Sequence, residues 1–558
     1  MKLISRACAL AAFAAALLAS PALAKFETTE RVVKSRSSDA DLVRESLVRV
    51  LDPLPKDVNA PRSCDYLEYL RFRSAEGPRR SRKADAVMVV IPGFLGGAAS
   101  FDQLARNTVR SAAKRGKHVE YWALDRRANC LEDDRGIRAA ARAEDYRKAY
   151  GYYWGGDSVR GKTFPGFKDE TEAEFLSEFG LERTVRDWYT VLRSGIRGQR
   201  RRERKVICGG HSLGGPLTAA FASWDFDGDP ETTKDAGYRQ CAGLLGLDTT
   251  LELSGSDEGA SAIGPLLDLV SQGGAAPFVN VPPLTPETIQ VPTVFGVGSY
   301  FEPDGTTMTP ELPSTPNIDL AQRALFSRDA VHFATGVPDI RDFTLSNQVS
   351  LGGVFDDNSA PLSFLRASVG FLEGGPIFDK NFPAPDGSLA LVEDPSDSVG
   401  YKWQTYGEVG PPDNPLELND AGAPYTSREG EVTSLRALGR TMWEAPANFT
   451  EQYFPVRILS DVAAAESGGF EDIRYDGPAL RPALLIQAGD SDSNDAPDEG
   501  KPIKGTPPND LPRSRETIIP GYNHLDVVTA AHRQNDGQVE PSARALSRFA
   551  LRVVRDAR

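Results

Sequence analysis

Residues 206–215 read VICGGHSLGG, and this stretch decides the fold class. The apolar run Val206 to Cys208 is typical of a short buried strand, and Ser212 opens a helical pattern that ends near Trp224. Between them lies G-x-S-x-G, the pattern of a sharp turn from a strand into a helix. Such a turn leaves no room for side chains at positions 210 and 214, so glycine is needed there. The turn lifts the hydroxyl of Ser212 clear of the backbone and makes Ser212 a candidate nucleophile.

Predicted strands alternate with predicted helices on both sides of this turn. Apolar runs typical of buried strands cover Ala86 to Ile91, His118 to Leu124, Cys241 to Leu247 and Pro482 to Ala488. Helical patterns separate them, for example at Phe101 to Ala113. Strands that alternate with helices predict a mostly parallel sheet, because parallel neighbours need crossover connections. A nucleotide-binding crossover is the competing interpretation, but the first strand–helix turn lacks G-x-G-x-x-G.

Two segments depart from this alternation. Residues 25–60 are polar, and within them Asp39 to Leu51 is predicted to form an amphipathic helix, followed by a strand at Tyr66 to Phe72. Residues 249–480 carry 23 of the 40 prolines and show no sustained period. We therefore expect 249–480 to be an inserted cap with much irregular structure.

A serine hydroxyl attacks poorly unless a base removes its proton, so a histidine has to lie within hydrogen-bond reach. His524, in PGYNHLD at 520–526, follows the last apolar run on a glycine-containing loop, where the fold can bring it over the sheet edge. His211 is expected to point elsewhere because it is adjacent to Ser212 in the turn. The other histidines lie at a strand start, in the insertion and in a later polar segment (His118, His332 and His532). We predict His524 as the base.

The imidazole also needs a carboxylate that holds its tautomer and stabilises the imidazolium. Asp490 and Asp492 lie in GDSD at 489–492, directly after an apolar run, and Asp248 follows the run before the insertion. Asp492 is favoured because a carboxylate three residues past the strand-ending glycine reaches towards His524, whereas Asp490 is placed to cap the turn. Asp248 stays an alternative.

Attack on a carbonyl places negative charge on its oxygen, which preorganised N–H donors have to stabilise. The backbone N–H of Leu213, at the start of a helix, is one candidate donor. The N–H of Phe94 is the other, in the glycine-rich loop IPGFLGG at 91–97 that leaves an interior strand. The glycines of this loop allow the backbone to approach a substrate closely.

Ser212, Asp492 and His524 occur in the chain order of the α/β-hydrolase superfamily. VIPGF at 90–94 resembles that family's oxyanion segment, with Pro92 in place of the usual histidine. The resemblance covers 25–248 and 481–558. It implies an α/β fold with an eight-stranded, mostly parallel sheet flanked by helices, a large cap inserted after the sixth strand, and hydrolysis through an acyl-serine intermediate.

On this resemblance we expect a serine hydrolase of the esterase or lipase type that cleaves carboxylic esters and uses no cofactor or metal. The superfamily spans many chemistries, so two other functions stay open. One is an amidase or peptidase that uses the same residues. The other is a non-catalytic binding protein on the same scaffold.

Composition and charge limit the classes of molecule that the protein is expected to bind. The chain has 558 residues, 40% hydrophobic and 25% charged, as in ordinary globular proteins. The formal charge of −14 repels phosphate backbones, so a nucleic-acid partner is not expected. A small-molecule or lipid-like ester is the expected partner, and the sequence gives no indication of oligomeric state.

The N-terminal residues match a cleavable secretory signal. Lys2 and Arg6 precede an apolar run from Ala7 to Ala19 and the triplet Ala-Leu-Ala at 22–24, so cleavage is expected before Lys25. The run is too short to span a bilayer, and no later stretch supplies a transmembrane anchor. We expect a secreted or periplasmic protein. Four cysteines remain after cleavage, and they allow three fully paired connectivities.

Two further motifs have ordinary structural explanations. DFDGD at 225–229 resembles a calcium loop, but Pro230 and Ala236 stand where an EF-hand needs glycine and glutamate, so a capped turn is predicted. The aromatic cluster YGYYWGG at 150–156 is expected to fill core, with contact to an acyl group as the alternative.

Overall fold

The computed structural model describes residues 26–253, 276–380, 382, 389–392, 395, 400–407, 430–490, 502–534, 537 and 539–557. The predicted signal segment, residues 1–24, lies outside the described residues. None of the described helices combines the length and the hydrophobicity that crossing a bilayer requires.

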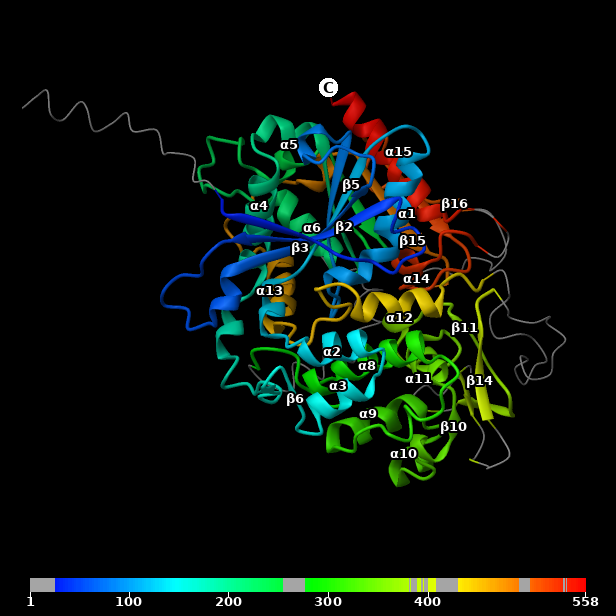
Figure 1. Cartoon of the computed structure of the whole chain (residues 1–558). Coiled ribbons are helices and arrows are strands. Elements are labelled where there is room, and N and C mark those ends of the chain that lie inside the picture. The colour runs from blue at the N-terminus through cyan, green and yellow to red at the C-terminus, as the bar shows by residue number, and fades with distance from the viewer. Residues whose placement is uncertain are drawn as a thin grey trace, which may run out of the picture.

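The centre of the molecule is a twisted sheet with the strand order β1-β2-β3-β5-β4-β8-β9-β15-β17-β16 (Figure 1). The strands are β1 (Thr28–Val32), β2 (Val43–Leu51), β3 (Tyr66–Ser74), β4 (Ala86–Ile91), β5 (Val119–Leu124), β8 (Val206–His211), β9 (Gly243–Leu247), β15 (Ala483–Ala488), β16 (Ile503–Lys504) and β17 (Arg515–Ile519). The six strands from β5 to β17 in this order pair in parallel, and the outer strands pair antiparallel. The prediction of a mostly parallel sheet is confirmed.

The expected count of eight strands is corrected to ten among the described residues. At one edge the polar strand β1, exposed along its whole length, pairs with β2. At the other edge the two-residue strand β16 folds back on β17. Short polar edge strands carry no buried apolar run, so the sequence pattern did not reveal them.

The helix expected at Asp39 to Leu51 is a strand instead, β2. The segment reads VRESLVRVL, in which β-branched valines are frequent, and it pairs with β3 along its full length. Its one charged residue that is fully buried, Glu45, forms an ion pair with Arg106. Pairing with the sheet therefore overrides a helical spacing of the apolar residues.

Helices cover both faces of the sheet. On one face α1 (Asp102–Ala113), α14 (Asp526–Thr529) and α15 (Pro541–Asp556) pack on alternate strand residues. On the other face α4 (Leu181–Gly195), α6 (Gly214–Ser223) and α13 (Val456–Glu466) pack on the intervening residues. The sheet is thus buried on both faces, which explains the continuous apolar runs of its central strands.

Apart from α13, most of the described residues between β9 and β15 build a second body, which lies below the sheet in Figure 1. Four elements of this body come from the segment between β5 and β8: α2 (Arg135–Ala143), α3 (Arg147–Tyr153), β6 (Ser158–Val159) and β7 (Lys162–Thr163). The others follow β9: α8 (Pro286–Phe301), α9 (Pro316–Phe326), α10 (Ala330–Thr335), β10 (Thr344–Leu345), α11 (Asn347–Phe355), β11 (Gly370–Glu373), β12 (Ile377–Lys380), β13 (Leu389–Val392), β14 (Gly400–Thr405) and α12 (Leu435–Trp443). A separate apolar core holds them together. The short helix α5 (Gln199–Lys205) precedes β8.

The aromatic cluster at 150–156 belongs to the core of this second body. Tyr150, Tyr152 and Tyr153 are buried in it, and the hydroxyl of Tyr150 donates to the carbonyl of Met308. The four cysteines form two disulfides, Cys64–Cys130 and Cys208–Cys241. This pairing is one of the three connectivities that the sequence allows.

Candidate active site

The turn that follows β8 has the strained geometry that a nucleophilic serine requires. Ser212 adopts a left-handed backbone conformation with φ of 55°, which non-glycine residues rarely adopt. Its N–H donates to the carbonyl of Leu247, the last residue of the neighbouring strand β9 (3.0 Å). A Cβ at Gly210 would lie 2.1 Å from the carbonyl oxygen of Gly214, and a Cβ at Gly214 would lie 2.5 Å from the carbonyl oxygen of Ile91. The glycine requirement predicted from the motif is therefore met.

The loop after β4 lies directly against this serine. A Cβ at Gly93 would lie 2.6 Å from the Cβ of Ser212, so the backbone of the loop can approach the serine only because position 93 is glycine. The N–H groups of Phe94 and Leu213 donate no hydrogen bond to another residue in the described part of the chain. Both predicted oxyanion donors are therefore unpaired with protein acceptors there.

His524 and Asp248 form a short hydrogen-bonded pair beside the turn. His524 lies on the loop between β17 and α14, and its Nδ1 is 2.6 Å from Oδ2 of Asp248. The other carboxylate oxygen of Asp248 accepts the N–H of Ala488 at 2.8 Å, which fixes the carboxylate plane. Asp248 directly follows β9, the strand next to β8, and parallel strands present their carboxyl ends at the same sheet edge. Both side chains are largely buried, with 5% of Asp248 and 15% of His524 exposed.

These contacts distinguish Asp248 from Asp490, two of the three carboxylates that the sequence offers as the partner of His524. Asp490 is a turn cap, as expected, because its Oδ1 accepts the N–H of Gly521 (3.1 Å). Asp492, which the sequence favoured, lies outside the described residues. Asp248, the alternative, is the carboxylate that contacts the ring of His524. The strand that precedes Asp248, β9, is adjacent to β8, whereas β15 is one strand farther away.

His211 lies in contact with His524, which the sequence did not reveal. It does not point away from the site: its ring lies 4.4 Å from the ring of His524, and its Nε2 is 3.1 Å from the carbonyl oxygen of His524. A carbonyl only accepts, so Nε2 carries the proton and donates. Burial, and then the nearby His524, hold the pKa of His211 well below its usual value. His211 is therefore neutral at pH 7. In the described residues no hydrogen bond joins Oγ of Ser212 to the ring of His524.

Residues of the second body hold the loop that carries His524. The N–H of Leu525 donates to the carbonyl of Arg366 (3.1 Å). The buried carboxylate of Asp526 accepts from the N–H of Ser368 at 3.1 Å and from the hydroxyl of Thr433 at 2.5 Å. The position of the histidine thus depends on segments 366–368 and 433, which are remote from it in the sequence.

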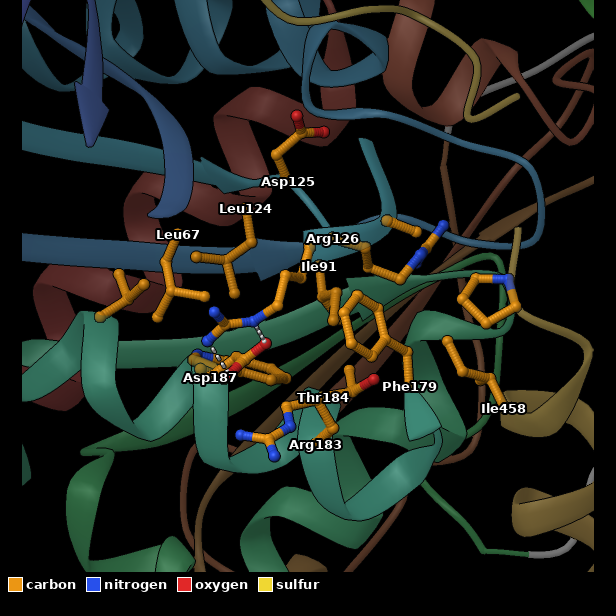
Figure 2. Close-up of a pocket in the computed structure, with 15 residues that line it drawn as sticks. Leu67, Ile91, Leu124, Asp125, Arg126, Phe179, Arg183, Thr184, Asp187 and Ile458 are labelled. Atoms are coloured by element: carbon orange, nitrogen blue, oxygen red, sulfur yellow. Dashed lines mark hydrogen bonds and ion pairs between the residues drawn. The ribbon is translucent and has the colours of Figure 1, made fainter. Parts of the chain in front are cut away.

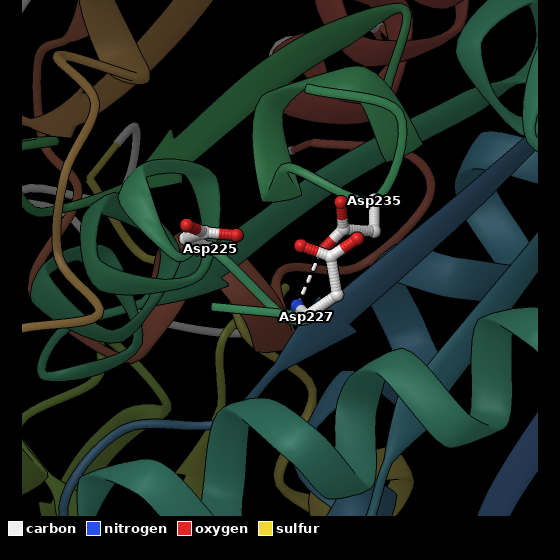
Figure 3. A group of neighbouring side chains, drawn as sticks. All are labelled: Asp225, Asp227 and Asp235. Atoms are coloured by element: carbon white, nitrogen blue, oxygen red, sulfur yellow. Dashed lines mark hydrogen bonds between the residues drawn. The ribbon is translucent and has the colours of Figure 1, made fainter. Parts of the chain in front are cut away.

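The DFDGD motif forms a turn on the surface beyond α6. Asp225, Asp227 and Asp235 gather there, with ligand-type oxygens within 4.8 Å of one another (Figure 3). Oδ1 of Asp225 accepts the N–H of Gly228, and Oδ1 of Asp227 accepts the N–H of Asp229. The predicted capped turn is present. Oδ2 of Asp225 is 3.4 Å from a guanidinium nitrogen of Arg474, so an ion pair already compensates the most buried of the three carboxylates.

Comparison with known proteins finds partial matches among solved structures. No family model matches the chain, and no curated protein matches it. Solved structures match parts of it. A thermostable esterase from Pseudomonas putida shares 14% identity over 42% of this chain and 47% of its own, with a TM-score of 0.16. The peroxisomal α/β-hydrolase Lpx1 from Saccharomyces cerevisiae shares 14% over 40% and 46%, with a TM-score of 0.18.

An acetyl xylan esterase from Paenibacillus sp. R4 shares 12% identity over 52% of this chain and 71% of its own, with a TM-score of 0.21. The chain spans about half the length of the first two structures. The strand order and the contacts at Ser212 carry the interpretation of the site.

Proposed function

We propose that the protein is a serine hydrolase of the α/β-hydrolase type that cleaves carboxylic esters. The observation that carries this proposal is the Asp248–His524 pair, 2.6 Å apart, beside a serine in a strained strand–helix turn. A carboxylate on Nδ1 leaves Nε2 as the ring nitrogen that can accept a proton. Two unpaired backbone N–H groups flank the same serine. These are the parts that acyl transfer through a serine needs.

In this mechanism Nε2 of His524 takes the proton of Ser212 as Oγ attacks the ester carbonyl, and Asp248 stabilises the imidazolium. The N–H groups of Phe94 and Leu213 donate to the oxyanion of the tetrahedral intermediate. When this intermediate collapses, the bond to the alcohol oxygen breaks and His524 returns the proton to that oxygen. Water then attacks the acyl-serine by the same route, and the free acid leaves. The Ser212–His524 hydrogen bond is expected to form with substrate bound, since such bonds are often long in free enzymes.

The proposal extends to substrate and compartment. A small-molecule or lipid-like ester is the proposed substrate, and no cofactor takes part in the mechanism. We propose that the protein is secreted or periplasmic. The two disulfides support this, because disulfides persist in oxidising compartments.

Hydrolysis of nitrophenyl esters with acyl chains of graded length tests the proposal. We expect turnover by the wild-type chain, and a loss of about 10⁵-fold in kcat for Ser212→Ala without a change in melting temperature. Turnover that survives in Ser212→Ala would contradict the assignment of the nucleophile. A matched anilide of the preferred acid separates an esterase from an amidase, since an esterase hydrolyses the ester much faster.

A further inference from the structure

The carbonyl groups of the loop after β4 converge on one buried guanidinium. Arg126 follows β5, and its side chain is 4% exposed. Its Nη1 donates to the carbonyl of Pro92 at 2.6 Å, and its Nη2 donates to the carbonyls of Gly93 and Gly96 at 2.6 and 2.8 Å. Figure 2 shows Arg126 among the residues that line the neighbouring cavity, which are both apolar, such as Ile91 and Phe179, and charged, such as Asp187. Hydrogen bonds that are buried in a protein are stronger than in water.

These bonds fix the direction of one peptide group beside the nucleophile. The peptide between Gly93 and Phe94 is trans, so its C=O and its N–H point in opposite directions. Because the carbonyl of Gly93 faces Arg126, the N–H of Phe94 faces the opposite side. A peptide that follows glycine rotates easily, and a rotated peptide would present its carbonyl oxygen in place of the N–H. An oxygen in that place would repel the oxyanion, so the proposed chemistry requires an anchor for this peptide.

A carboxylate from the second body holds the guanidinium in turn. Oε2 of Glu451, which is fully buried, accepts from Nε of Arg126 at 2.5 Å. The N–H of Glu451 donates to the carbonyl of Leu95 (2.7 Å). The N–H of Gly97 donates to the carbonyl of Phe449 (2.8 Å). The loop is therefore held by hydrogen bonds from Arg126 and from the backbone of segment 449–451.

We infer that Arg126 is a positioning residue for the oxyanion site: held by Glu451, it fixes the Gly93–Phe94 peptide so that the N–H of Phe94 is ready for the oxyanion. This inference rests on the proposed ester hydrolysis. It assigns a role in the reaction to a residue that does not itself touch the substrate, and it makes the second body part of the catalytic apparatus through Glu451.

The experiment compares Arg126→Gln with Arg127→Gln. Arg127 is the matched control, because it is the next residue, is equally buried, and bonds carboxylates and backbone carbonyls as Arg126 does, but none of them in the 92–97 loop. We expect kcat on the nitrophenyl ester to fall about 100-fold in Arg126→Gln with KM nearly unchanged, as for loss of an oxyanion donor. In Arg127→Gln we expect kcat within about threefold of the wild-type value at a temperature where both variants are folded.

A second readout separates positioning from general destabilisation. A trifluoromethyl ketone forms a tetrahedral adduct with the serine, whereas the product acid does not. Arg126→Gln is expected to weaken the ketone about 100-fold and the acid less than threefold. Equal weakening of both, or an unchanged kcat in folded Arg126→Gln, would overturn the inference.

If Arg126→Gln does not fold, Glu451→Gln is assayed at pH 8. Burial raises the pKa of Glu451 to about 7, so the wild-type carboxylate is charged at pH 8, and the variant keeps its shape while removing that charge. We expect a drop of about tenfold in kcat for this variant, partly restored in Glu451→Asp. An unchanged kcat in Glu451→Gln would overturn the inference. Failure of the proposed ester hydrolysis is distinguishable from failure of this inference. In the first case the wild-type chain itself shows no ester turnover that depends on Ser212, whereas in the second case only the effect of the Arg126 and Glu451 substitutions is missing.

Discussion

The turn at Ser212 and the loop at His524 lie in contact, yet they are held in place by different means. The turn is built locally: β8, two glycines and α6 define it, and the neighbouring strand β9 supplies both the acceptor for the Ser212 N–H and the carboxylate of Asp248. The His524 loop is held partly by Asp490, which follows β15, and partly by Arg366, Ser368 and Thr433 of the second body.

This difference indicates what each part of the molecule contributes to the reaction. The backbone of the nucleophile is held mainly by an adjacent strand, because the Ser212 N–H bonds Leu247 of β9. The base His524 depends on long-range contacts with that body, and so does the loop after β4, residues 92–97, which carries the oxyanion donor Phe94 and is called the oxyanion loop below. Substitutions in the sheet should therefore impair chemistry and leave stability nearly unchanged, whereas substitutions at the contacts with the second body should reduce both.

The largest effect in this comparison is expected at the sheet-borne carboxylate. Asp248→Asn keeps the shape but leaves His524 without a charged partner and favours the wrong tautomer, so kcat should fall about 10⁴-fold. The matched substitutions Asp490→Asn and Asp492→Asn should leave kcat within about threefold. Steady-state kinetics on one nitrophenyl ester measures all three. A large loss in Asp492→Asn with an active Asp248→Asn would reverse the assignment of the acid.

The next effect tests the close approach of the oxyanion loop. Gly93→Ala introduces a methyl group 2.6 Å from the Cβ of Ser212, so the loop has to move away and kcat should fall at least about 100-fold. Gly400→Ala is the control, because the nearest atom to its Cβ is 3.8 Å away. Comparable activity of the two variants would show that the loop does not lie against the serine during turnover.

A smaller effect is expected where the second body holds the histidine. Thr433→Val removes the hydroxyl that donates to Asp526 while keeping the side-chain shape. Burial raises the pKa of Asp526 to about 7, so its carboxylate is charged at pH 8. Hydrogen bonds to a charged acceptor contribute about 1.5–3 kcal/mol, so at pH 8 the free energy of unfolding should drop by about that amount, and kcat should fall about tenfold. Thr335→Val is the control, since its hydroxyl bonds a carbonyl one turn away in the exposed helix α10. Loss of stability with unchanged kcat would separate this contact from catalysis.

The smallest effect concerns the pH dependence of stability. The pKa of His211 is lowered in the folded protein, so below pH 6.5 the unfolded chain binds a proton that the folded chain does not. Stability should therefore decline on acidification below pH 6.5, by about 1.4 kcal/mol per pH unit for this one group. His211→Gln, which can still donate to the carbonyl of His524, should remove this part of the slope. Urea unfolding at pH 5, 6 and 7 measures it, and equal slopes for the two proteins would contradict the expectation.

Local patterns allowed much of the fold and part of the site to be predicted. The continuous apolar runs predicted the central strands, because a sheet covered on both faces needs them. The turn at Ser212 was predictable because its glycines are required by contacts within a few residues and one neighbouring strand. His524 was predictable as the histidine after the last strand, and it lies in contact with His211.

What the sequence did not reveal depends on pairings between distant segments. The order of strands across the sheet decides that Asp248 contacts His524, and no local pattern contains that order. Arg126 could have been noticed as a charged residue at the end of a buried strand, DRR at 125–127. Glu451 lies in a segment without periodicity, so only the folded chain reveals that it bonds Arg126.

The most direct measurement is peptide mapping by mass spectrometry after a timed reaction with a fluorophosphonate. We predict that the phosphonyl group is found on Ser212, that Asp248→Asn and His524→Ala each slow its attachment at least about 100-fold, and that Asp492→Asn does not. A label on another residue, or an undiminished rate in Asp248→Asn, would contradict the assignment of Ser212, Asp248 and His524 as one catalytic unit.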